Sequence, residues 1–385
     1  MTFAKIPYGR QDITQADIDA VTTVLREDFL TQGPHIDAFE KAFASYIDCK
    51  YAVAVANGTA ALHLAALALG VNKDSRVITS PITFAASANC VRYCGGEVHF
   101  VDIDPNTIHL DISKVKQLLE SRPAGTFSGL IPVDLAGYPV QTELFRALAD
   151  EHGLWILEDA CHAPGGSFID SQGVEQFCGN GKYADLAIFS FHPVKHIAAG
   201  EGGMITTNDK ELYEKLIQLR THGITKNPDK LLRNEGGWYY EMQTLGYNYR
   251  LTDFQCALGS SQLKRASQGL KRRREIAAKY DRAFADTEIR LIEVAPGFDH
   301  AYHLYVIQVD DRKGLYEHLI SNKIYAQVHY IPVHLQPYYQ ELGWQRGDFP
   351  SAEKYYNHCL SIPMYPTLTE DEQDFVIQEI LNFIQ

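Results

Sequence analysis

The sequence predicts an α/β fold with a mostly parallel central sheet, followed by a smaller α+β domain at the carboxyl end. Short apolar runs alternate with helix-like stretches over most of the 385 residues, which is typical of α/β proteins. The helix-like stretches carry apolar residues at three- and four-residue spacings, as helices that cover a sheet do. After about residue 265 the pattern changes, and this change marks the second domain.

Seven apolar runs are expected to form the strands of the central sheet: 51–56, 76–80, 97–102, 129–133, 154–158, 186–191 and 203–207. Three amphipathic stretches between them are expected to be covering helices: 60–69, 112–121 and 142–152. In such a sheet the ligand-binding groups are expected at the carboxyl ends of the strands.

The carboxyl-terminal part begins with a strongly basic helical segment, 263–280. Basic runs are usually solvated helix faces, and this one is expected to link the two domains. The remaining elements are expected to be strands and helices of a small α+β domain: strand 303–309, helix 312–322, strand 324–330 and helix 371–383. We therefore predict a large domain over residues 1–265 and a small domain over residues 266–385.

The balance of acidic and basic residues limits the classes of partner that this protein is expected to bind. Lysine and arginine number 35 against 48 aspartate and glutamate, which gives a net charge of −13 and argues against a nucleic-acid or anionic-membrane surface. An anionic small molecule in a local pocket remains possible. The seven cysteines include no CxxC pair, so neither a disulfide framework nor a metal site is expected. Without a signal-like start or a long apolar run, a cytoplasmic location is expected.

The first segment that can carry chemistry is Asn57-Gly58-Thr59, where an apolar strand ends and a helix opens. A turn of small residues at a helix start directs free N–H groups and the positive end of the helix dipole outward, which suits a phosphate. An ordinary capped helix explains the same residues equally well. The segment is not a Walker loop, and no GxGxxG fingerprint follows any predicted strand.

In the second segment, Glu158 and Asp159 lie at the end of a wholly apolar strand, and His162 follows three residues later. A carboxylate at that position can hold a protonated ring nitrogen through a charge-assisted hydrogen bond. A lone aspartate after a strand is more often a turn residue or a helix cap.

The third segment contains Lys195, in a short connection between two predicted buried strands and in a stretch otherwise poor in charge. Most lysines are solvated surface charges, but a desolvated lysine has a lowered pKa and can form a Schiff base. Glycines near 200–203 would let the chain turn tightly beneath a flat ligand. A phosphate turn, an acid and then a lysine along one α/β sheet is the order of a pyridoxal 5'-phosphate (PLP) site.

Several motifs resemble the DegT/DnrJ/EryC1/StrS family of sugar aminotransferases, which are fold type I PLP-dependent transferases. The motifs are NGTAAL, SPITFAASAN, EDACHAPG, SFHPVKHIAAGEGG, GYNYRLTDFQCALG and AQVHYIPVH, and the resemblance covers essentially the whole chain. His162, the run 190–192 and the run 327–330 are most similar to the branch that serves pseudaminic acid biosynthesis.

The resemblance implies a role for each matching residue at the cofactor. It makes Lys195 the Schiff-base lysine and Asp159 the partner of the pyridine nitrogen. The other implied cofactor contacts are Thr59 and Ser190 at the phosphate, with Ala60 beside them, Phe84 stacked on the ring, His162 at the phenolic oxygen, and Asn248 reaching the phosphate of a neighbouring subunit. Many relatives carry glutamine at the position of His162, so its protonation state is left open. The role of Asn248 implies a homodimer with shared active sites.

The same resemblance implies that L-glutamate donates an amino group to C4 of a UDP-linked 4-keto-6-deoxy-N-acetylhexosamine. The candidate substrate contacts are Tyr8, Asp28, Phe29, Leu30, Thr31, Gln327, Val328, His329 and Tyr330. His329 and Arg250 are the candidates for the diphosphate. Without the resemblance, 327–332 would be interpreted simply as a strand that enters a turn.

Three alternatives stay open at this point. The first is an aminotransferase for another UDP- or dTDP-linked 4-keto sugar, or for the opposite stereochemistry at C4. The second is the dehydratase variant of the fold, which lacks the lysine and often carries histidine there; Lys195 argues against it, although His196 lies beside it. The third is a non-catalytic PLP-binding regulator.

Overall fold

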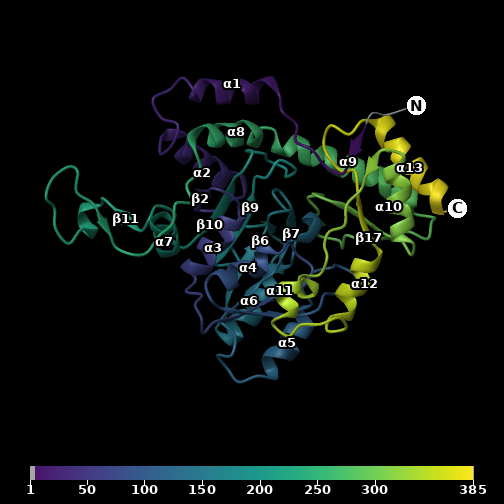
Figure 1. The fold of residues 1–385 in the computed structure, drawn as a ribbon, viewed down its shortest axis with the longest axis horizontal. Helices are drawn as coiled ribbons and strands as arrows, with labels where there is room; N and C mark the ends of the chain where they lie inside the picture. Colours follow the sequence, from purple (N-terminus) through teal and green to yellow (C-terminus); the bar gives the residue numbers. More distant parts are fainter. Residues whose placement is uncertain (1–4, 385) are drawn as a thin grey trace.

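A seven-stranded sheet lies at the centre of the computed structural model, which describes residues 5–384 (Figure 1). Its strands, in spatial order, are β2 (Tyr51–Val55), β10 (Gly203–Thr207), β9 (Leu186–Ser190), β6 (Trp155–Asp159), β5 (Gly129–Ile131), β3 (Arg76–Thr79) and β4 (Glu97–Phe100). Only β10 runs antiparallel to its neighbours, β2 and β9. The mostly parallel sheet predicted from the sequence is therefore confirmed, with all seven of its strands.

The sheet is buried on both faces, which explains its nearly continuous apolar strands. Successive side chains of a strand point to opposite faces. Accordingly, Leu157 and Ile188 belong to one buried cluster, whereas their neighbours Ile156 and Phe189 belong to two clusters on the other face. The helices of the two layers are α3 (Gly58–Ala68), α4 (Ala86–Tyr93) and α7 (Lys210–Arg220) on the first face, and α2 (Pro34–Tyr46), α5 (Ile112–Glu120), α6 (Thr142–His152) and α8 (Asp253–Leu263) on the second.

An arm extends from this body between α7 and α8, on the left of Figure 1. It contains β11 (Ile224–Thr225), the short helix η2 (Pro228–Lys230) and β12 (Glu241–Met242), which pairs with β11. Helix α1 (Gln15–Val24) packs on α8 at another edge of the body. Among the described residues, none of the helices is both long and apolar enough to span a bilayer.

The carboxyl-terminal part has its own core. The antiparallel sheet β13 (Arg290–Leu291), β15 (Tyr305–Gln308) and β17 (Cys359–Ile362) packs with α9 (Ala266–Phe284), α10 (Arg312–Ser321) and α13 (Glu370–Ile384). The domain boundary at residue 265 stays a prediction. Residues from both sides of it cross over: Ile6 packs in the second core, and Tyr339 and Phe349 pack in the first.

The strand predicted over 324–330 is shorter than expected. Only β16 (Ile324–Tyr325) forms, paired with β1 (Ile6–Pro7), and Gln327 makes an isolated bridge to Ser361. Beyond it the chain turns inward with a cis peptide bond between His329 and Tyr330, and both of these side chains reach a cavity at the carboxyl ends of the central strands. The apolar residues of this segment divide between two settings: Ile324 and Ala326 belong to the second core, whereas residues 327–330 line the cavities.

Smaller elements join the two parts. A three-stranded sheet combines β14 (Phe298–Asp299) with β7 (Ser167–Ile169) and β8 (Glu175–Phe177). The remaining elements are the short helices η1 (Leu135–Gly137), η3 (Val333–Leu335), α11 (Pro337–Gln340) and α12 (Pro350–His358). The turn that contains η1 is important for the site, because its carbonyl groups accept the N–H groups of Ala301 and Leu304 and so fix the segment that precedes β15.

Candidate active site

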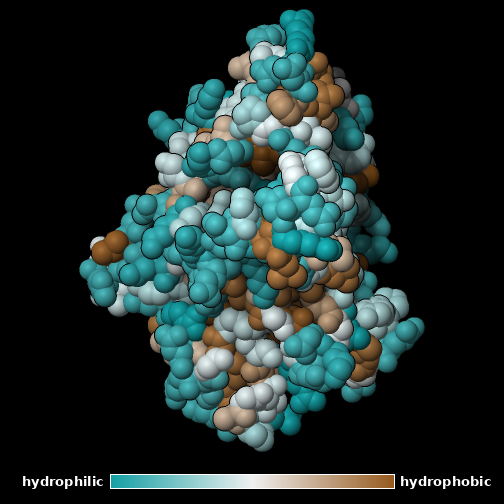
Figure 2. All heavy atoms as spheres, turned by 90° about the vertical axis from the view of Figure 1, so that its left-hand side faces the viewer, coloured by the Kyte–Doolittle hydropathy of each residue, from teal (hydrophilic) through white to brown (hydrophobic). Residues whose placement is uncertain are grey.

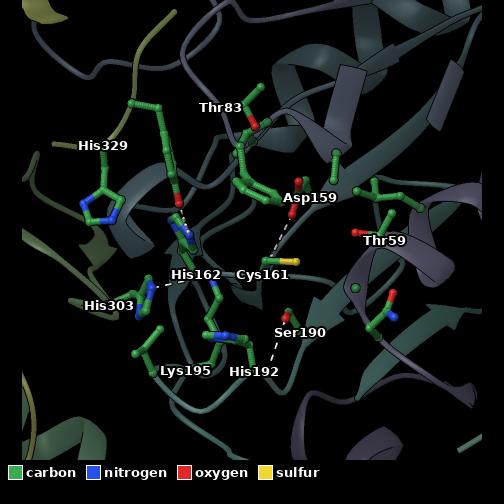
Figure 3. Close-up of a pocket in the computed structure, with 18 of the residues that line it drawn as sticks. Thr59, Thr83, Asp159, Cys161, His162, Ser190, His192, Lys195, His303 and His329 are labelled. Carbon is green, nitrogen blue, oxygen red and sulfur yellow. Dashed lines mark hydrogen bonds between the residues drawn. The ribbon is translucent and has the colours of Figure 1, made fainter. Parts of the chain in front are cut away.

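A cavity of about 450 Å³ opens at the carboxyl ends of β6 and β9, and it collects most of the residues singled out in the sequence (Figure 3). Nine of the predicted site residues line it: Tyr8, Thr59, Phe84, Asp159, His162, Ser190, Lys195, His329 and Tyr330. Gln327 and Val328 line an adjoining cavity of about 310 Å³ that shares Tyr8, Phe84, His329 and Tyr330 with the first. The fold thus brings together residues that are more than 300 positions apart in the sequence.

The turn between β2 and α3 forms one end of the cavity. Asn57 caps the helix, because its Oδ1 accepts the Ala60 N–H at 2.8 Å. The N–H groups of Gly58 and Thr59 belong to the first turn, which has no intrahelical acceptors, and both residues line the cavity. A Cβ at Gly58 would lie 3.0 Å from the Cβ of Ser190, so glycine lets the turn approach the end of β9. The result is an anion cradle of backbone N–H groups beside a serine hydroxyl.

Asp159 lies at the end of β6, with its side chain held on both oxygens. The Ser87 hydroxyl donates to Oδ2 at 2.6 Å, and the Cys161 N–H donates to Oδ1 at 3.2 Å. Thr83 Oγ1 lies 2.7 Å from Ser87 Oγ and completes the chain of hydroxyl groups. Asp159 is 5% exposed, and its carboxyl group faces the cavity in a fixed orientation. Ser87 and Thr83 were not identified from the sequence. Ser87 lies 72 positions before Asp159 in the sequence, and nothing in the motif SPITFAASAN indicates that its hydroxyl contacts that residue.

Lys195 lies opposite, partly buried in the connection that follows β9. Burial lowers the pKa of its amine and Arg273 lowers it further, while Cys161 and Asp159 act in the opposite direction. The Nζ atom lies 3.4 Å from Nε2 of His303, and Figure 3 shows the two side chains meeting at the cavity wall. A lysine in this setting loses its proton more readily than a surface lysine does.

The neighbouring histidines are neutral. His162 Nδ1 accepts the Ala136 N–H at 3.2 Å, so the ring proton is on Nε2, which lies 3.2 Å from the Tyr330 hydroxyl. Burial, and then the charge of Lys195, hold the pKa of His162 well below its usual value. A neutral ring with its proton on Nε2 is the form that fits these contacts. Burial likewise lowers the pKa of His329 to about 3, and its Nδ1 lies 2.8 Å from Ser361 Oγ.

The remaining candidates do not reach the cavity of their own chain. Ala60 is buried in the helix behind the cradle, and Asn248 is exposed, with its Oδ1 accepting from Nε of Arg250 at 2.9 Å. The segment 28–31 is exposed as well, held near α8 by a bridge between Thr31 and Thr252.

The cavity residues fit PLP. Backbone N–H groups and a hydroxyl suit its phosphate, a fixed carboxylate suits its ring nitrogen, and a deprotonatable amine suits its aldehyde. His162 adds an Nε2–H donor on the same wall, and the ring of Phe84, which is 60% exposed, offers an aromatic face.

Comparisons with known proteins agree with this chemistry. The model of the DegT/DnrJ/EryC1/StrS aminotransferase family matches residues 11–381. The chain is 38% identical to the spore coat polysaccharide biosynthesis protein SpsC of Bacillus subtilis, over 99% of this chain and 97% of that protein. It is 37% identical to a UDP-4-amino-4,6-dideoxy-N-acetyl-β-L-altrosamine transaminase of Campylobacter jejuni, over 99% and 98% of the two chains.

Among solved structures, the chain resembles Helicobacter pylori PseC, an aminotransferase involved in the biosynthesis of pseudaminic acid. The TM-score is 0.87 at 30% identity, and the match covers 99% of both chains.

Proposed function

Because the chain belongs to the DegT/DnrJ/EryC1/StrS aminotransferase family, we propose that it transfers the amino group of L-glutamate to C4 of a UDP-linked 4-keto-6-deoxy-N-acetylhexosamine. The protein is a PLP-dependent sugar aminotransferase, which acts on a keto sugar carried by a nucleotide and on an amino donor. The UDP carrier, the identity of the donor and the pseudaminic acid pathway are the proposed part. The relatives from Campylobacter jejuni and Helicobacter pylori support them.

One observation carries the proposal: a lysine with a lowered pKa and a fixed buried carboxylate face the same cavity, next to a cradle of N–H groups. When bound, PLP supplies an electron sink for the negative charge that develops on the reacting carbon. We assign Lys195 Nζ as the group that would hold the cofactor aldehyde and that, once a substrate amine has displaced it, would take a proton from one carbon and return it to another. Its lowered pKa suits this acid–base role near neutral pH.

The other cavity residues hold and orient the cofactor. The Asp159 carboxylate keeps a proton on the ring nitrogen, and its orientation is fixed by Ser87 and the Cys161 N–H. The N–H groups of Gly58 and Thr59 and the Ser190 hydroxyl bind the phosphate. Because the Ala136 N–H occupies Nδ1 of His162, its Nε2–H is the ring group that would donate to the phenolic oxygen, in exchange for the contact that Nε2 makes with the Tyr330 hydroxyl at 3.2 Å.

We place the nucleotide sugar across the two adjoining cavities. Tyr8 and His329, which line both cavities, would contact the sugar, and Gln327 and Val328, which line the second cavity, would contact the nucleotide. Neutral His329 contributes hydrogen bonds and no positive charge, since burial lowers its pKa to about 3. Arg250 is therefore our candidate for the cationic contact to the diphosphate. It does not line the cavity of its own chain.

A homodimer supplies that missing part of the site. The arm exposes large apolar side chains: Leu232 is 93% exposed, Trp238 75% and Leu245 74%. Figure 2 faces this side and shows brown hydrophobic patches among hydrophilic atoms. Apolar groups of this size rarely stay in water without a partner. We propose that the arm packs on a second copy and brings Asn248 and Arg250 to the neighbouring cavity.

The test is a glutamate-dependent assay over a panel of UDP- and dTDP-linked 4-keto sugars, with the stereochemistry of each product determined. We expect amination of the UDP-linked N-acetylhexosamine to give the β-L-altrosamine product. Activity confined to a dTDP sugar would refute the UDP assignment, and an epimeric product would refute the stereochemical one. If no sugar is aminated, the non-catalytic regulator becomes the better account.

A further inference from the structure

The basic segment at the start of α9 has no role in the proposed reaction, yet it lines a second large cavity. This cavity has a volume of about 560 Å³ and lies between the first three turns of α9, the segment 10–14 and the segment 366–367. Lys195 and His196 line it too, so it adjoins the active-site cavity on the other side of the Lys195 connection. In a chain of net charge −13, its lining is markedly positive.

Besides Lys195, five cationic side chains line the cavity and only two carboxylates do: Arg10, Arg265, Lys271, Arg272 and Arg273, against Asp12 and Glu275. Two of the cations are already paired. Arg265 contacts Asp12 at 3.0 Å and also Asp17, and Arg272 contacts Glu370 at 2.9 Å and Glu275 at 3.5 Å. Within residues 5–384, the other three cations have no carboxylate at ion-pair distance, and this leaves an uncompensated positive charge.

Among these three cations, Arg273 indicates an anion site most clearly. It is 2% exposed, and its Nη1 donates to the carbonyl oxygens of Tyr302, His303 and Met364. Its Nε is buried without an acceptor anywhere in the described chain. Burial lowers the pKa of Arg273 to about 10, which expresses the cost of a guanidinium held away from water without a counter-ion. An anion in the cavity would remove that cost.

The start of α9 adds a second attraction for an anion. The helix is 19 residues long, and its N-cap residue, Arg265, makes no capping hydrogen bond through its side chain. The N–H groups of the first turn therefore lack intrahelical acceptors, and Ala266, Gln268 and Gly269 line the cavity there. Arg10 stands across the opening, with its Nε donating to Thr367 Oγ1 at 3.3 Å.

We propose that this cavity binds a phosphate-class polyanion, such as inorganic pyrophosphate or the phosphate group of a nucleotide. Free N–H groups at a helix start together with guanidinium groups are the donor set that phosphate oxygens accept best. The volume is also ample for a pyrophosphate or a mononucleotide. The site differs from the proposed PLP phosphate cradle, which lies at the start of α3 on the other cavity.

The test is calorimetric titration of the PLP-loaded enzyme with pyrophosphate, UMP and glutarate. Lys271→Glu and Arg10→Gln change exposed cavity residues that are not part of the proposed catalytic site. Lys264→Glu is the matched control, because this exposed lysine on the same stretch of chain does not line the cavity. We expect each cavity variant to weaken pyrophosphate binding about tenfold or more, and the control to leave it unchanged.

Four results would overturn the proposal: no pyrophosphate binding by the unmodified enzyme, equal affinity in the cavity variants, an equal loss in the control, or glutarate binding as tight as pyrophosphate. The UMP titration distinguishes the source of the phosphate. If UMP binds more tightly than pyrophosphate and Lys271→Glu weakens both equally, the ligand of the cavity is a nucleotide. If UMP binds more weakly, the ligand is the free anion.

Discussion

Replacing Glu158 by glutamine is expected to stabilise the folded protein at alkaline pH. Glu158 is 4% exposed on β6, and its Oε1 accepts the Gly179 N–H at 3.0 Å. The titratable groups that face it are Asp134, Asp159 and Cys178, and among the described residues no cation pairs with it. Burial raises the pKa of Glu158 from 4.5 to about 7, while the Gly179 N–H and Asp134 act against the rise and Asp159 adds to it.

The sign and size of the effect follow from proton linkage. Between pH 4.5 and 7 the folded state binds a proton at Glu158 that the unfolded state has lost, so stability falls as pH rises through this window. Glu158 shares this titration with the Asp134 carboxyl buried beside it, and the raised pKa of Glu158 sets the loss in the free energy of unfolding at a few kcal/mol. Glutamine stays neutral throughout and keeps an acceptor for Gly179, so the variant avoids this loss.

The assay is urea unfolding of both proteins at several pH values between 5 and 8, at a fixed PLP concentration. The difference in unfolding free energy, variant minus unmodified, is expected to rise with pH by about 2 to 3 kcal/mol. Glu288→Gln serves as the control, because Glu288 is exposed, and it is expected to give a nearly constant difference. Parallel curves for Glu158→Gln and the unmodified protein would refute the linkage.

Three further substitutions test the site and the arm. Asp159→Asn is expected to leave the fold intact and to lower transamination by about a hundredfold or more, measured as the rate of the glutamate half-reaction; a near-normal rate would remove its electronic role. Ser87→Ala, which deletes the 2.6 Å hydrogen bond to Asp159, is expected to weaken PLP binding about tenfold in a fluorescence titration, and unchanged affinity would contradict this. Gly223→Ala is expected to distort the arm, because Gly223 has φ +70° and a Cβ there would lie 1.8 Å from the Thr244 carbonyl oxygen. We expect the dimer dissociation constant, measured by sedimentation, to rise at least about tenfold. An unchanged dissociation constant would show that the arm does not hold the dimer together.

The central sheet could be predicted because each strand carries its own signal. Strands buried on both faces are short apolar runs, and helices such as α5 show a regular apolar spacing. The segment 324–330 also alternates apolar and polar residues, but only 324–325 form a strand while 327–330 line the cavities, and composition alone does not distinguish the two settings. That strand was therefore predicted too long.

The local sequence marks a site residue where it stands at a strand end, at a helix start or in a charge-poor connection. Asp159 ends β6, Thr59 lies in the first turn of α3 and Lys195 lies in the connection after β9, and all three line one cavity. His303 and Ser87 escaped notice because their contacts with Lys195 and Asp159 join residues 108 and 72 positions apart. Such contacts depend on how the η1 turn and α4 pack, which no local pattern records.

The most direct test of the account is to locate the covalent attachment of PLP. The PLP-loaded protein is reduced with borohydride and digested, and the modified peptide is identified by mass spectrometry. We predict that the reduced cofactor is on Lys195 and that Lys195→Ala shows neither the adduct nor the visible absorbance of the bound cofactor. An adduct on another lysine of the unmodified protein, or an unchanged reducible adduct in Lys195→Ala, would contradict the assignment of this cavity as the active site.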